Sequence, residues 1–203
     1  MGLYTLMKFV HIAAAILLVG SYLLAPVLHG AIRGATDVRA LRALARLQHR
    51  VISASGPAAA LVLAAGVYMT FAGWSFTNGW IVVSITLFVT NGTLAMSVVD
   101  PHVKKLIAAA DEASDGPPDG TLIGIVRDAR VLGAMRVVVG IDLAILFLMV
   151  NKPGWIGSLA VAAAGLALGA SLAVVATKRS QQPVQTPATA ESRGPLRARA
   201  HHR

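Results

Sequence analysis

The sequence predicts an all-α fold, a polytopic transmembrane helical bundle of about five spans. Three observations support this prediction. Hydrophobic residues make up 56% of the 203 residues and charged residues only 13%, whereas a typical soluble domain has about 25% charged residues. The apolar residues gather in five runs, each near the ~20 residues that cross a hydrocarbon core of about 30 Å. The cationic residues lie mainly in the segments between these runs.

The five apolar runs define the expected spans, with four helices forming a core and a fifth appended to it. The first run is longer than the apolar core of a typical secretory signal peptide, and no clear A-x-A cleavage site follows it, so we expect it to remain as a span. Residues 1–177 therefore form one predicted bundle. Residues 178–203, rich in Gln, Pro, Thr, Ala and Arg, form a predicted basic, disordered cytoplasmic tail. The spans cover residues 3–28, 51–72, 79–99, 131–150 and 155–177.

Lysine and arginine counts in the loops predict the orientation of the chain. The first and third loops carry several cationic residues, the second carries none and the fourth carries only Lys152. Because cationic loops stay on the cytoplasmic side, we expect the N-terminus outside and the C-terminus in the cytoplasm. Trp74, Trp80 and Trp155 fall at the outer boundary, where indole rings prefer to lie, whereas Lys8 argues weakly for the opposite orientation.

The net charge of +9 predicts the partners of the chain. The basic loops and tail would contact the anionic headgroups of the lipid bilayer. We expect no nucleic-acid partner, because no aromatic residue interleaves the charges of the tail. A homo-oligomer is left open.

The first loop is expected to be helical. Thr36 or Asp37 would cap the helix, and four arginines recur at spacings of 3, 4 and 4 residues, which places them on one face. This helix either lies at the membrane surface or extends the second span. The third loop contains a turn-rich break at residues 113–120. The arginines are Arg39, Arg42, Arg46 and Arg50.

Gly165 and Gly169 form a G-x-x-x-G motif in the fifth span. Such a motif lets two membrane helices pack closely against each other. Glycine is also common in membrane helices in general, so the motif has two interpretations of similar weight.

Four polar residues lie inside the predicted spans, where an ionisable group is costly unless it has a partner. They are His11, Asn91, Arg136 and Asp142. Counted from the outer boundary, His11 and Asp142 lie at a similar depth of ~12 Å, with Asn91 about a turn deeper. We therefore expect that His11 and Asp142 can meet, so that the carboxylate fixes the imidazole tautomer. Arg136 lies nearer the cytoplasm and snorkels or pairs with Asp142. The alternative is a structural polar cluster that only holds helices together.

Three further histidines lie near one plane at the cytoplasmic side of the predicted bundle. His29 ends the first span, His49 precedes the second and His102 follows the third. Neutral imidazoles are ligands for haem iron, copper or zinc, so these three are a candidate metal site. The alternative is that they are ordinary interfacial side chains without a ligand. His11 and His29 are 18 residues apart, which places them on one face of an unbroken helix unless Pro26 kinks it.

Several kinds of chemistry are excluded by the sequence. It has no cysteine, which rules out disulfides, thiolate metal sites, cysteine nucleophiles and CxxC-linked haem. It also has no nucleophile elbow, phosphate-binding loop, HExxH motif or dinucleotide fingerprint. Enzymatic activity and catalytic residues are therefore left open.

The stretch LMKFVHIAAAILLVGSYLLAPVLHG, followed by LARLQHRVISASGPAAALVLAAGVYM, resembles a family of predicted integral membrane proteins called domain of unknown function 2269. The resemblance covers roughly residues 1–150. More distantly, the chain resembles bacterial haem-dependent membrane protoporphyrinogen oxidases and CopD-like copper-resistance proteins. This resemblance implies a multi-pass protein of the bacterial inner membrane with His11 as a haem b ligand. The positions of the other histidines make His29 or His49 a second candidate. The oxidases also use a lysine in their third span, and residues 79–99 contain none.

Three functions follow from these patterns. The first is a haem b-binding or redox-associated protein that uses His11. The second is a transport protein for a small solute, a metal or protons that uses His11, Asn91 and Asp142. The third is a structural membrane protein without a ligand.

Overall fold

The computed structural model describes residues 2–181, with side chains described through residue 175. The described residues contain helices and no strand. Five helical segments are long and apolar enough to cross a membrane, so the predicted all-α polytopic fold is confirmed. Residues 182–203, most of the predicted disordered tail, lie outside the described residues. The elements are α1 (Leu3–Arg33), α2 (Val38–Gly73), α3 (Gly79–Leu94), the π-helix η1 (Ala95–Val99), α4 (Asp100–Glu112), α5 (Gly120–Val126), α6 (Ala129–Asn151) and α7 (Trp155–Gln181).

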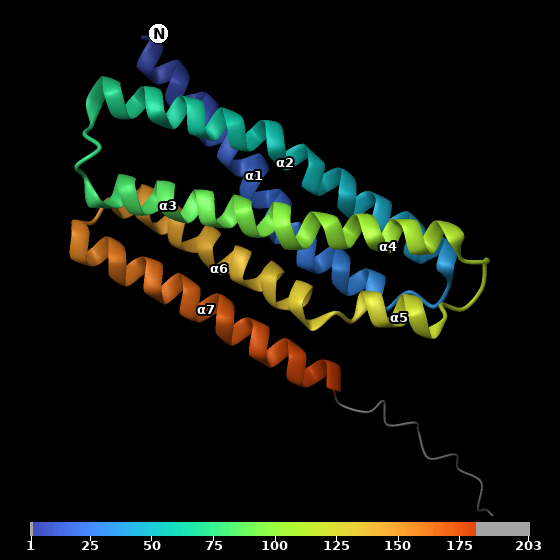
Figure 1. Cartoon of the computed structure of the whole chain (residues 1–203). Coiled ribbons are helices and arrows are strands. Elements are labelled where there is room, and N and C mark those ends of the chain that lie inside the picture. The colour runs from blue at the N-terminus through green and yellow to red at the C-terminus, as the bar shows by residue number, and fades with distance from the viewer. Residues whose placement is uncertain (1, 182–203) are drawn as a thin grey trace, which may run out of the picture.

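The helices run back and forth between two ends of the molecule (Figure 1). The connections at residues 74–78 and 152–154 share one end, which we call the tryptophan end. The connections at residues 34–37 and 113–119 share the other, which we call the arginine end. The cationic and neutral loops of the sequence therefore separate to opposite ends, as the positive-inside pattern requires. Which end faces the cytoplasm stays a prediction.

Two helical segments are much longer than the spans expected from their apolar runs. The helix α2 has 36 residues, and α3, η1 and α4 form one continuous segment of 34 residues. At ~1.5 Å per residue each exceeds 50 Å, against a hydrocarbon core of about 30 Å. The helix predicted in the first loop is thus the beginning of α2 and extends the second span. Asp37 is its cap, because its side chain accepts a hydrogen bond from the amide of Arg39 at 2.7 Å.

The excess length forms a helical extension at the arginine end with an apolar core of its own. Leu41 of α2, Leu106 of α4 and Leu122 of α5 are fully or almost fully buried in this core. Three arginines of α2, Arg39, Arg42 and Arg46, form ion pairs with α4 and the following turn. Arg46 contacts Asp111 at 2.8 Å, and Arg39 contacts Asp115 at 2.7 Å. These carboxylates therefore neutralise part of the cationic face that the sequence analysis assigned to lipid headgroups. The short helix α5 was not predicted.

Helices α6 and α7 pack very closely, and glycines make this approach possible. A Cβ atom added at Gly165 would lie 2.6 Å from the Cβ of Ala144, and one added at Gly169 would lie 2.7 Å from the Cα of Val137. No real Cβ atom tolerates such distances, so the geometry favours the close-packing interpretation of the G-x-x-x-G motif. The fifth span is thereby appended to α6 at the outside of the bundle (Figure 1).

Candidate intramembrane binding site

A cavity of about 630 Å³ lies between α1 and α2 on one side and α3 and α6 on the other. It occupies the half of the bundle nearer the tryptophan end, and most of its wall is aliphatic or aromatic. The helices that form it remain in contact at the other end, where Ala25, Ile52, Val103 and Met135 pack in one buried cluster. The cavity is therefore a gap between two helix groups that are joined on the arginine side.

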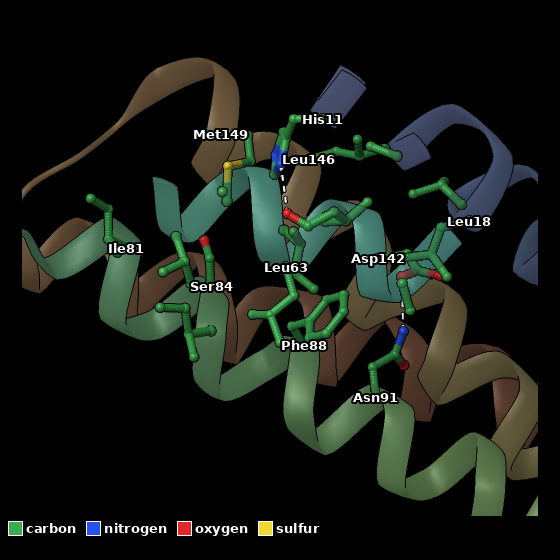
Figure 2. Close-up of a pocket in the computed structure, with 18 of the residues that line it drawn as sticks. His11, Leu18, Leu63, Ile81, Ser84, Phe88, Asn91, Asp142, Leu146 and Met149 are labelled. Carbon is green, nitrogen blue, oxygen red and sulfur yellow. Dashed lines mark hydrogen bonds between the residues drawn. The ribbon is translucent and has the colours of Figure 1, made fainter. Parts of the chain in front are cut away.

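His11 lies in the wall of this cavity and is oriented by α2 (Figure 2). Its Nδ1 lies 2.9 Å from the carbonyl oxygen of Val62. A carbonyl oxygen can only accept, so Nδ1 carries the proton and Nε2 of the neutral ring has the lone pair. Among the described residues the structure gives Nε2 no hydrogen-bonding partner. Gly66 makes the contact possible, because a Cβ there would lie 3.2 Å from His11 Cε1.

Asn91 and Asp142 form a buried pair deeper in the same cavity (Figure 2). Asn91 Nδ2 donates to Asp142 Oδ1 at 2.8 Å, and each residue is 3% exposed. The second carboxyl oxygen of Asp142, Oδ2, and the amide oxygen of Asn91, Oδ1, are buried without a hydrogen-bonding partner in the described part of the chain. This pair links α3 to α6 and presents unpaired acceptors.

The predicted contact between His11 and Asp142 is not formed. His11 bonds Val62 and Asp142 bonds Asn91, although both side chains line one cavity. Arg136 does not pair with Asp142 either, because its Nη1 donates to the carbonyl oxygen of Leu132 at 2.7 Å. Leu132 lies one turn towards the arginine end, so Arg136 adopts the snorkelling alternative.

A group of lysine and aromatic side chains forms the opening of the cavity at the tryptophan end, and sequence reasoning did not identify it as part of the site. We call it the lysine–aromatic rim and define it as Tyr4, Lys8, Trp74, Trp80 and Lys152. The sequence spacing could have indicated this face of α1, because its cavity-lining residues recur every three or four positions. They include residues 4, 8, 11, 15, 18 and 22.

The three histidines predicted as a second group lie near the arginine end, and none of them lines the cavity. His29 and His102 come together with ring centroids 6.1 Å apart, and His29 Nε2 lies 3.0 Å from the carbonyl oxygen of Val126. His49 instead lies 3.5 Å from Asp100. Within residues 2–181 no group of three or more His, Asp or Glu side chains could hold a metal ion, so the predicted three-histidine metal site does not assemble.

His29 and His49 also lie too far from His11 to bind the same haem iron. About 27 Å of helix lies between His11 and His29, since they are 18 residues apart on α1 at ~1.5 Å per residue. The thioethers that share the cavity with His11 are instead those of Met69, Met96 and Met149 (Figure 2 labels Met149). An imidazole and a thioether are a known pair of axial ligands for haem iron.

The comparisons with known proteins agree with this architecture. A family described as "Predicted integral membrane protein (DUF2269)" has a model that matches residues 5–153. The match spans more than half of the chain, includes every residue of the cavity except Tyr4, and ends before α7. Neither the comparison with curated proteins nor the comparison with solved structures gave a match. The more distant resemblance to haem-dependent oxidases and CopD-like proteins is not shown by these comparisons.

Proposed function

Because the chain belongs to the DUF2269 family of predicted integral membrane proteins, a lipid bilayer surrounds its cavity, and we propose that this cavity binds haem b with His11 as an axial iron ligand. The side chains of the cavity favour such a ligand. Small-molecule sites have volumes of about 300–1,000 Å³ and mostly apolar walls with a few placed polar groups. The cavity here, of about 630 Å³, has that size and character.

The orientation of His11 is the single observation that supports this proposal most strongly. Histidines that bind a metal almost always donate their other ring N–H to a carboxylate, a backbone carbonyl or water. His11 does so to Val62 at 2.9 Å, which leaves Nε2 as the free donor atom in the cavity wall. Gly66 provides the space for the ring against α2.

The residues of the chain have separate roles in this proposal. His11 would hold the iron, Val62 and Gly66 would orient the imidazole, and Met149 would be the candidate second ligand. The apolar wall keeps water away from the ligand. Haem, when bound, supplies one-electron redox chemistry whose potential depends on the axial ligands.

Absorbance spectroscopy tests the proposal directly. The detergent-purified protein supplied with haem should show a Soret band that shifts and weakens strongly in His11→Ala. The matched control is His49→Ala, which removes an imidazole outside the cavity and should leave the band unchanged. No Soret band in the unmodified protein, or an undiminished one in a folded His11→Ala variant, would disprove the proposal.

Transport of protons or small cations is a second candidate, which the Asn91–Asp142 pair favours. Ionisable residues inside a membrane bundle are rare and mark substrate, ion or proton pathways among other functional sites, and Asp142 Oδ2 is buried without a partner among the described residues. In liposomes loaded with a pH-sensitive dye, Asp142→Asn should abolish flux, with Asp115→Asn as the control outside the bundle. Unchanged flux in the variant, or no flux in the unmodified protein, would remove this candidate.

A structural role is the remaining alternative for the same pair, because its hydrogen bond joins α3 to α6. In that case Asp142→Asn would impair assembly without any change in ligand binding or flux. A coloured purified protein would count against a purely structural function.

A further inference from the structure

Two lysines face the same end of the cavity, one on each of its sides. Lys8 lies on α1, three residues from His11, and Lys152 follows α6, three residues from Met149. Residues three or four positions apart on a helix lie on the same side. Lys8 is therefore about one turn nearer the tryptophan end than His11, and Lys152, the left-handed residue that caps α6, follows Met149 at that same end. We infer that the lysine–aromatic rim binds the anionic end of the cavity's ligand, which for haem b means its two propionate carboxylates. This inference rests on the proposed function.

Contacts within the rim hold the two lysines in one cluster. Lys152 Nζ lies 4.5 Å from the centroid of the Trp74 ring and 5.9 Å from that of Trp80. Trp74 Nε1 donates to the hydroxyl of Tyr4 at 3.3 Å, and Lys8 Nζ lies 5.5 Å from the Tyr4 ring centroid. The two indoles pack edge to face with centroids 5.2 Å apart. The cationic groups are thus positioned by rings rather than left to extend freely.

The positive charge of the rim is not neutralised by the described part of the protein. The structure shows no ion pair for Lys8 or Lys152 within residues 2–181. A cation–π contact stabilises an ammonium group but leaves its N–H donors available. The rim therefore offers hydrogen-bond donors and two positive charges beside an apolar volume, which is the complement of an amphiphile with carboxylates at one edge.

The residues that line the opposite end of the cavity include no lysine or arginine. Asp142 lies ten residues before Lys152 along α6, a distance of ~15 Å at ~1.5 Å per residue. At that end Asn91 Oδ1 is a buried acceptor without a partner among the described residues, and an anionic ligand group beside it would leave both acceptors without a donor. A ligand with an acidic edge is thereby oriented in one direction only, with the acid at the tryptophan end.

Lipid headgroups could also supply anions to these lysines, because long cationic side chains near helix ends extend towards the membrane surface. The experiment must therefore separate ligand carboxylates from lipid phosphates. Haem b and its dimethyl ester share the ring and the iron but differ in the two carboxylate charges. Their dissociation constants should be measured by Soret titration in nanodiscs of phosphatidylcholine, with and without phosphatidylglycerol.

The expected result is a loss of discrimination between acid and ester when the lysines are removed. A partly exposed ion pair contributes about 0.2–1 kcal/mol, so Lys8→Gln and Lys152→Gln should each weaken haem b binding about 1.4- to 5-fold. Binding of the dimethyl ester should be unchanged in both variants. Lys105→Gln, which alters a lysine at the arginine end, is the matched control and should bind both ligands as the unmodified protein does.

Other outcomes overturn the inference in distinguishable ways. If haem b binds but the variants weaken acid and ester equally, or only in discs with phosphatidylglycerol, the lysines serve the lipid and the inference fails while the proposed function stands. If neither haem b nor its ester produces a Soret band in the unmodified protein, the proposed function fails and the inference falls with it.

Discussion

The substitution Gly66→Ala should disturb the orientation of His11 while changing the stability of the bundle little. The added Cβ would lie 3.2 Å from His11 Cε1 and 3.3 Å from Nδ1, which is closer than ordinary van der Waals contact. The imidazole must therefore shift by a few tenths of an ångström, which disturbs its alignment with the carbonyl oxygen of Val62. We expect the 2.9 Å hydrogen bond between them to weaken or break.

The two energetic effects of this substitution oppose each other in the absence of a ligand. Losing a hydrogen bond costs about 0.5–1.5 kcal/mol, whereas replacing glycine by alanine inside a helix gains about 0.8–1 kcal/mol. The free energy of unfolding should thus change by less than about 1 kcal/mol. Ligand affinity has no such compensation, because the removal of a partner that orients a metal-bound histidine typically lowers metal affinity about 10- to 100-fold.

Two measurements on one sample check this prediction. Soret titration with haem gives the dissociation constant, and thermal unfolding in detergent gives the stability. Gly56→Ala is the matched control, because Gly56 is on the same helix and a Cβ there would meet nothing within 4 Å. It should raise the unfolding temperature slightly and leave affinity unchanged. If Gly66→Ala binds haem as tightly as the unmodified protein, then the contact with Val62 does not orient an iron ligand.

Three further predictions concern the rest of the bundle. Gly165→Val should separate α7 from α6 and lower stability by about 1–3 kcal/mol, as overpacking of a close contact does, and an unchanged aggregation temperature in detergent would contradict this. The hydrogen bond from Arg39 holds the pKa of the Asp115 carboxyl below its ordinary value, so this contact stabilises the fold above the ordinary pKa and is lost as the pH falls through the lowered one. Proteolysis of residues 113–119 should therefore increase in acid in the unmodified protein and lose that dependence in Asp115→Asn. Finally, since the chain has no cysteine, single Asn78→Cys and Ser114→Cys variants report topology. A membrane-impermeant maleimide should label the first in intact cells and the second only after permeabilisation, and the reverse pattern would invert the proposed orientation.

Much of the fold could be predicted because hydropathy reports directly on which segments cross lipid. The lengths of the helices could not be predicted in the same way. The first half of α2 carries four arginines, so its helical continuity does not register as an apolar run. Its stability comes from the buried side of Leu41 against Leu106 and Leu122, which is tertiary packing that a single segment does not reveal.

The residues of the candidate site could be predicted, but not which of them contact one another. Depth along each span placed His11, Asn91 and Asp142 near one another, and all three line one cavity. Depth does not determine the rotation of a helix about its axis, so it could not show that His11 faces Gly66 and Val62 rather than Asp142. The lysines were interpreted only as topology signals, because a charge near a helix end has that role in most membrane proteins.

The extension at the arginine end joins the two groups of helices that enclose the cavity. It packs α1 and α2 against α4 and α5. At the opposite end the helices around the cavity meet through the connection at residues 74–78 and the lysine–aromatic rim. The five-residue π-helix η1 lies between α3, which lines the cavity, and α4, which belongs to the extension. Because displacement grows with distance from a pivot, a rotation of a few degrees at the extension would move the cavity walls farther than it moves the extension itself.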